Sequence, residues 1–121
     1  MIFSCGIDIE EKERFNKHYF EKGILSNLIY DIFTTKEIEN FSVFGKEAFL
    51  KGFSFKEAFY KACSNVDIDF FDVEMQFETE SELELSYSKG TKAWLQERNI
   101  KTHVSFQEEK KFVICKVLLI S

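Results

Sequence analysis

Strict alternation of apolar and polar residues between positions 71 and 78 limits the possible folds of this chain more than any other feature. The apolar residues of this segment are Phe71, Val73, Met75 and Phe77. A period of two residues is that of a strand with one buried face and one solvated face. Residues 79–81 are predicted to turn the chain, and apolar residues at positions 83, 85 and 87 continue the same face. The sequence therefore predicts a β-hairpin that packs on a core.

The flanking segments predict further strands and several helices. Predicted strands cover residues 1–9, 102–106 and 112–120, and the last is apolar enough to be central in a sheet. Predicted helices cover residues 10–22, 46–63 and 91–99. Gly23 is expected to end the first helix, and Thr34 with Glu37 forms a capping box that begins another. We therefore expect an α+β domain with a mostly antiparallel sheet and helices packed on one face.

Length and composition indicate one domain spanning residues 1–121. Hydrophobic residues make up 45% of the chain and include 15 Phe, which argues against disorder. No apolar run approaches the roughly 18 residues of a membrane span, and no basic segment precedes the short apolar stretch at the N-terminus. Cys5, Cys63 and Cys115 lie far apart in apolar surroundings, so we expect buried, reduced side chains in a cytoplasmic protein rather than a disulfide or a zinc site.

Two short segments contain the residues best suited to chemistry. Residues 6–10, Gly-Ile-Asp-Ile-Glu, predict a buried strand that ends by presenting the carboxylate of Asp8. Residues 53–61, Phe-Ser-Phe-Lys-Glu-Ala-Phe-Tyr-Lys, predict a helix with Glu57 and Lys61 one turn apart on one face. Two carboxylates suit Mg²⁺, which keeps water ligands and takes phosphate oxygens from a substrate. These residues therefore point to phosphoryl-type transfer, which needs positioning and charge neutralisation more than covalent chemistry.

The same two segments resemble the signature of the 4'-phosphopantetheinyl transferases, and the short chain fits the holo-acyl-carrier-protein synthase branch. The similarity extends to residues 6–15, 32–37, 71–74, 104–106 and 112–117, in the order of that branch. The resemblance implies a Mg²⁺-dependent enzyme that transfers 4'-phosphopantetheine from coenzyme A to a serine of an acyl, or other, carrier protein and releases 3',5'-ADP. It further implies a cytoplasmic homotrimer with sites between subunits, acting in fatty acid biosynthesis.

The resemblance also assigns roles to individual residues. Asp8 and Glu57 are expected to hold Mg²⁺, or Mn²⁺, which accepts the same oxygen ligands. Glu57, or a water that it holds, is expected to take the proton from the carrier serine. Lys61 is expected to contact phosphate. Without the resemblance, the presence of Lys61 four residues after Glu57 is explained by an ion pair between the two on an exposed helix. Arg14 is expected to dock the carrier, or else to form a surface salt bridge of little energetic value.

The other expected coenzyme A ligands are Lys56, Lys51 and Ser105. Coenzyme A and carrier proteins are anionic, so the functional surface should lie with the lysines of residues 46–61 and with Arg14. The acidic hairpin, which has no Lys or Arg between positions 65 and 85, should face away. The formal net charge of -5 at pH 7 argues against nucleic acid as a partner. Glu10 and Glu11 would assist the metal, or would simply favour a helix N-terminus.

Residues 46–51 nearly repeat residues 56–61 ten positions earlier, which offers Glu47 as a rival to Glu57. Ten residues do not complete a whole number of helical turns, so the two copies cannot share a helix face. Only the second copy follows the aromatic residue and small hydroxyl residue of the family pattern, Phe53 and Ser54. We therefore interpret Glu57 as the functional residue and Glu47 as a solvated one.

The chain departs from the branch at the expected coenzyme A site. Gln107 and Glu108 replace a serine and a histidine, Gly52 replaces an arginine, and the loop after the motif helix is shortened to residues 63–65. His103 is no obvious substitute. The acidic side chain of Glu108 at this expected site would repel the phosphates of coenzyme A. Two hypotheses follow: a diverged transferase, or a catalytically weak module that binds a carrier protein or coenzyme A without transfer. The sequence does not identify the carrier.

Overall fold

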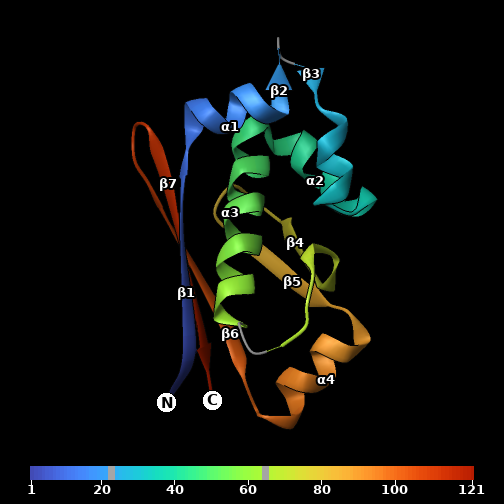
Figure 1. The fold of residues 1–121 in the computed structure, drawn as a ribbon, viewed down its shortest axis with the longest axis vertical. Coiled ribbons are helices and arrows are strands. Elements are labelled where there is room, and N and C mark those ends of the chain that lie inside the picture. The colour runs from blue at the N-terminus through green and yellow to red at the C-terminus, as the bar shows by residue number, and fades with distance from the viewer. Residues whose placement is uncertain (22–23, 64–65) are drawn as a thin grey trace.

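The computed structural model describes residues 1–21, 24–63 and 66–121 and confirms the α+β fold (Figure 1). The strands are β1 (Ile2–Glu11), β2 (Phe20–Glu21), β3 (Ile24–Leu25), β4 (Val73–Phe77), β5 (Leu83–Tyr87), β6 (Lys101–Glu108) and β7 (Phe112–Ile120). The α-helices are α1 (Lys12–Tyr19), α2 (Thr35–Phe44), α3 (Lys46–Ala62) and α4 (Lys89–Glu97). Short 3-10 helices cover Asn27–Asp31 and Phe70–Asp72.

The largest sheet has the strand order β1-β7-β6, with both pairs antiparallel, so β7 is central as predicted. The predicted hairpin forms a separate two-stranded sheet, β4–β5, and β2–β3 form another. Figure 1 shows α3 between the three-stranded sheet on one side and α2 with β4–β5 on the other. α1 crosses one end of α3, and α4 lies near the other. The acidic hairpin therefore lies on the opposite side of α3 from β1. In the described part of the chain, no helix is long and apolar enough to cross a membrane.

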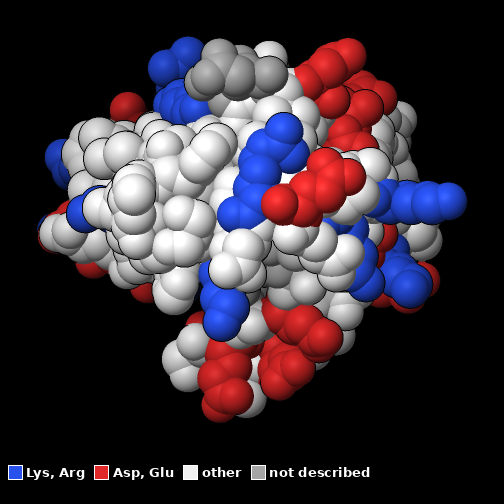
Figure 2. All heavy atoms as spheres, turned by 90° about the horizontal axis from the view of Figure 1, so that it is seen from below, with Lys and Arg blue, Asp and Glu red and all other residues white. Residues whose placement is uncertain are grey.

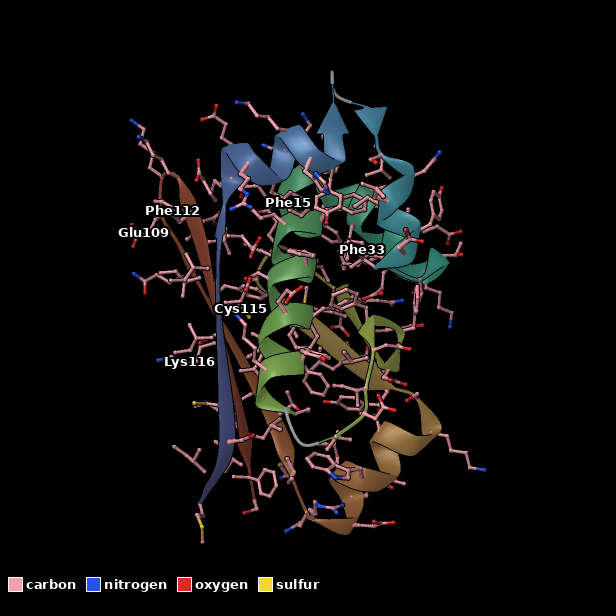
Figure 3. All side chains as sticks on the ribbon, in the orientation of Figure 1. Phe15, Phe33, Glu109, Phe112, Cys115 and Lys116 are labelled. Carbon is pink, nitrogen blue, oxygen red and sulfur yellow. The ribbon has the colours of Figure 1, made fainter. Side chains whose placement is uncertain are left out.

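The core lies around α3, where aromatic rings pack edge to face. Phe33, Phe41 and Phe49 have ring centroids 5.3 to 5.9 Å apart. Gly52 lies in the middle of α3 because a Cβ there would stand 2.6 Å from the Phe41 ring. The side chains of β7 alternate, so Cys115 points toward α3 while Phe112 and Lys116 point away (Figure 3). Helices thus cover only one face of the three-stranded sheet, as predicted.

The first helix and the first strand of the hairpin both begin later than predicted. β1 continues to Glu11, so α1 begins at Lys12 and ends at Tyr19, inside the range predicted for the helix; Gly23 lies outside the described residues. The strand of the hairpin begins at Val73, and Phe71 is 46% exposed instead of sharing the buried face. The reason is local: the Asp69 side chain accepts a hydrogen bond from the Phe71 N–H at 2.8 Å and holds a 3-10 turn there.

The cysteines differ in environment. Cys63 and Cys115 are buried as expected, but Cys5 is exposed because it lies on the outer face of β1. Burial raises the pKa of Cys63 to about 11 and that of Cys115, near the Asp8 charge, to about 12.

These pKa values predict the thiol chemistry of a Cys5→Ser variant. Fewer than about one in 100 of the remaining thiols is ionised at pH 8, and thiolate is the reactive form. We expect the folded variant to resist Ellman's reagent at pH 8 and to react at two thiols per chain in denaturant. Rapid reaction without denaturant would contradict the burial of these side chains.

Candidate functional site

The site forms where β1 crosses α3 at very short range. A Cβ on Gly6 would stand 1.9 Å from the Ala58 carbonyl oxygen and 2.8 Å from the Ala62 nitrogen. Only glycine allows this approach. Asp8 lies two residues further along the same face of β1, so its side chain points at α3 and is only 6% exposed. Gly6 of the first motif thus brings Asp8 to the helix that carries the second motif.

Residues of α3 hold both carboxylate oxygens of Asp8. The fully buried Ser54 donates a hydrogen bond from Oγ to Asp8 Oδ2 at 3.0 Å. Lys61 donates from Nζ to Asp8 Oδ1 at 3.2 Å and to the Ile7 carbonyl oxygen at 3.1 Å. Lys61 is therefore paired with Asp8 across the two elements, and it is not engaged in the alternative pair with Glu57. The sequence alone did not indicate the role of Ser54, which the motif presents only as a small hydroxyl residue.

Three carboxylates crowd this site. Burial, hydrogen bonding to Asp8 and the charges of Asp8 and Glu57 raise the pKa of Glu10 to about 8. Burial and the charge of Asp8 also raise the pKa of Glu57, and the charge of Lys61 opposes that rise. The sequence predicts a strand that ends at Ile9 and so places Glu10 in a helix, whereas β1 continues to Glu11. Continuing the period of two by one step would have placed Glu10 on the face of Asp8.

An open cleft of about 1030 Å³ lies over these carboxylates. Its lining residues include Asp8, Glu10, Glu57, Arg14 and Tyr19. Phe53 and Tyr19, with ring centroids 5.8 Å apart, add an aromatic wall. The cleft thus brings the predicted metal ligands Asp8 and Glu57 together with Arg14 of α1.

The excess of carboxylates suits a hard cation. Within the described residues, no group of three His, Cys, Asp or Glu side chains is arranged to hold a metal ion by itself. Mg²⁺ in proteins is usually bound by one or two carboxylates and completed by water and phosphate oxygens. Asp8 and Glu57 fit that pattern, because both carboxylates line the open cleft and their mutual repulsion would be relieved by a cation.

The prediction that Lys56 binds coenzyme A is wrong. Its side chain is fully buried and forms an ion pair with Glu37 at 2.7 Å. Its Nζ also donates to the carbonyl oxygens of Phe70 and Val73. The lysines of α3 are spaced by five residues, which rotates each by about 140° from the last. They therefore occupy different faces, and Lys56 falls on the face that packs against α2 and β4.

Lys51 and Ser105 do not meet Asp8 or Glu57 within one chain. Ser105 is exposed on the outer face of β6, opposite Lys116 of β7. Lys51 lies 3.7 Å from Glu108 and faces the Phe106 ring.

Gln107 and Glu108, which depart from the family pattern, lie in two different environments. Gln107 is on the outer face and donates to Glu109 at 2.7 Å. Glu108 turns toward α3, 3.5 Å from Lys12 and 3.7 Å from Lys51. A hydrogen bond with Glu47 and these lysine charges lower the pKa of Glu108. Lys12 and Lys51 thus balance the charge of Glu108. Glu47 is a surface residue as expected, with 56% of its side chain exposed.

Comparison with known proteins agrees with this arrangement. The holo-acyl-carrier-protein synthase of Neisseria meningitidis is 25% identical, with a TM-score of 0.78 over 100% of both chains. That of Helicobacter pylori, solved with coenzyme A, is 20% identical with a TM-score of 0.74, over 96% of this chain and 99% of that one. That of Bacillus anthracis, solved with coenzyme A (3',5'-ADP), is 26% identical with a TM-score of 0.68, over 98% and 96%.

Among curated proteins, no sequence matches this chain. The family model of the 4'-phosphopantetheinyl transferase superfamily, in contrast, matches residues 4–116. The chain therefore belongs to the 4'-phosphopantetheinyl transferase superfamily and has the fold of its short holo-acyl-carrier-protein synthases.

Proposed function

We propose that this chain transfers 4'-phosphopantetheine from coenzyme A to a serine hydroxyl of an acyl, or other, carrier protein. The serine oxygen forms a new bond to the phosphorus that carries pantetheine, and the bond from that phosphorus to 3',5'-ADP breaks. The observation that carries the proposal is the convergence of Asp8, Glu57 and Arg14 on one open cleft. Two carboxylates at the cleft match an anionic substrate bound through a divalent cation, and Arg14 adds a positive charge to the lining.

Asp8 and Glu57 would hold Mg²⁺, which supplies neutralisation of charge on the pyrophosphate as the leaving group departs. Glu57 accepts the proton of the serine hydroxyl, and its raised pKa makes it a stronger base than an ordinary carboxylate. Lys61, half-exposed at the edge of the site, binds a phosphate oxygen. Arg14 lies on exposed α1 at the cleft and docks the acidic carrier.

We further propose a homotrimer in the cytoplasm, acting in fatty acid synthesis where the carrier is an acyl carrier. The support for assembly is the uncovered outer face of the three-stranded sheet. Phe3, Ile7, Ile9 and Phe112 are 41% to 59% exposed there, on β1 and β7. Figure 2, viewed from the end with the termini, shows a broad uncharged area on the side of these strands. Exposed apolar residues gathered on one face of a protein are typical of protein–protein interaction sites. Ser105 lies on this same outer face, so assembly would bring it to a neighbouring copy.

A weak binding module remains the second candidate. The observation in its favour is that Glu108 engages Lys51, one of the lysines expected to bind coenzyme A. Such a module would bind coenzyme A or the carrier but would leave the serine unmodified.

The proposal is tested by intact-mass spectrometry of apo carrier proteins incubated with this protein, coenzyme A and Mg²⁺. We expect a mass gain of one phosphopantetheine group. Asp8→Asn and Glu57→Gln are each expected to lower the rate by about 100-fold or more, because each removes a negative charge that would hold the Mg²⁺ that neutralises the phosphates in the transition state.

Glu47→Gln is the matched control, since it makes the same change in the neighbouring copy of the motif on α3 and should leave the rate unchanged. Chelation of the metal should abolish the mass gain. Binding of coenzyme A without a mass gain on any carrier, while a known transferase modifies the same panel, would favour the binding module.

A further inference from the structure

Asp8 is contacted in two physically different ways by the same helix. Ser54 is fully buried, and its Oγ has no access to water, so its hydrogen bond to Oδ2 is a fixed part of the interior. Lys61 reaches Oδ1 from the surface with 51% of its side chain exposed. The exposed ammonium group of Lys61 can exchange its contact with Asp8 for water, whereas removal of the buried Ser54 donor leaves an unsatisfied oxygen on Asp8.

We propose that Ser54 is a positioning residue that anchors Asp8 through Oδ2, and that Lys61 is a displaceable cation that occupies Oδ1 until the metal arrives. This inference rests on the proposed function, which assigns the metal to Asp8 and Glu57. With a metal held by Asp8 and Glu57, the Nζ of Lys61 would be released from Asp8 toward the phosphate of the substrate. Lys61 then serves the site in two states, as a counter-ion before metal binding and as an anion ligand after it.

The geometry supports an exchange of one cation for another. A cluster of three carboxylates is formed by Asp8, Glu10 and Glu57. Within the described residues, the cation that contacts this cluster is Lys61. Lys61 Nζ also keeps a contact with the Ile7 carbonyl oxygen at 3.1 Å, so it can leave Oδ1 without losing every partner. Ser54 has no comparable freedom, because it lies on a fully buried face of α3. The two contacts with Asp8 therefore predict opposite effects on metal affinity.

The test is binding of Mn²⁺ in the absence of coenzyme A, measured from the electron paramagnetic resonance signal of free Mn²⁺. Ser54→Ala is expected to weaken Mn²⁺ binding by about 10- to 100-fold, as for other groups that orient a metal ligand. Lys61→Met is expected to strengthen it by about three- to fivefold, because a competing charge is removed. Matched controls are Ser42→Ala on α2 and Lys92→Met on α4, which change exposed residues and should leave the affinity unchanged.

Anion binding adds a second readout. With Mn²⁺ saturating, Lys61→Met should weaken binding of 3',5'-ADP in a calorimetric titration by about fivefold or more. Without Mn²⁺ the variant should bind 3',5'-ADP nearly as the unmodified chain does, because Lys61 is then engaged with Asp8. An equal loss of 3',5'-ADP affinity with and without Mn²⁺ would overturn the proposed displacement of Lys61 from Asp8.

Shifts of the two variants in the same direction, or no Mn²⁺ binding by the unmodified chain, would overturn the inference. Where Ser54→Ala does not fold, Ser54→Cys keeps a weaker donor of similar size and should weaken Mn²⁺ binding to a smaller degree. The outcome is separable from that of the proposed function. Opposite shifts of Mn²⁺ affinity in the two variants, without phosphopantetheine transfer, would support the roles of Ser54 and Lys61 and reject the transferase. Transfer without opposite shifts would support the transferase and reject these roles.

Discussion

Lys56→Met is expected to lower the free energy of unfolding by about 3–5 kcal/mol, the cost of leaving a buried partner charge uncompensated. The side chains of Lys56 and Glu37 are both fully buried and lie 2.7 Å apart. Burial raises the pKa of Glu37, and burial lowers that of Lys56, so each charge depends on the other. The loss is large because Met neither neutralises Glu37 nor donates to the backbone.

The ion pair also satisfies backbone groups at the start of α2 and in β4. Glu37 accepts hydrogen bonds from the N–H groups of Thr34 at 3.0 Å and Met75 at 2.9 Å. Lys56 donates to Val73 at 2.8 Å. An apolar pair of the same size would leave these groups unpaired, so it should not restore stability. Glu37 of the predicted capping box thus has a second role that joins α2, α3 and β4.

Chemical denaturation followed by circular dichroism measures this effect. Lys36→Met, next to Glu37 but exposed, is the control and should change stability by less than about 0.5 kcal/mol. Glu37→Gln should also destabilise, and the double variant should lose less than the sum of the two single losses. Had Lys56 been a coenzyme A ligand, its variant would keep its stability and lose affinity instead.

Gly6→Ala is expected to destabilise the protein by about 3 kcal/mol or more, at the upper end of overpacking effects. The added methyl group would stand 1.9 Å from the Ala58 carbonyl oxygen, which is backbone and cannot rotate away. β1 must therefore move away from α3. Asp8 moves with it, so any folded fraction should also bind Mn²⁺ weakly.

Gly90→Ala is the control, because a Cβ at that position of α4 meets no atom within 4 Å. Alanine favours a helix over glycine, so this variant should be neutral or more stable by up to about 1 kcal/mol. Thermal unfolding of both variants compares the effects directly. A Gly6→Ala protein as stable as the unmodified chain would contradict the close packing of β1 on α3.

The alternation of residues 73–87 and the helical spacing of residues 53–61 predict the observed hairpin and helix because both patterns are local. A strand places every second residue on one face, and a helix places Glu57 and Lys61 one turn apart, whatever they pack against. The failure at Phe71 is also local. The Asp69 side chain competes for the backbone N–H of Phe71 and delays the strand until Val73.

The sequence by itself determined the α+β class, the central position of β7, and Asp8 and Glu57 as a candidate carboxylate pair. The periodicity of each strand and helix predicts the class and the position of β7, and the motifs on β1 and α3 predict the carboxylate pair. Only the tertiary structure decided that Lys56 is buried with Glu37, that Glu10 joins Asp8, and that Ser54 and Lys61 share the oxygens of Asp8. Those contacts join residues far apart in the chain or depend on where β1 ends. A repeating pattern states which face a residue occupies on its own element, and only packing decides what that face meets.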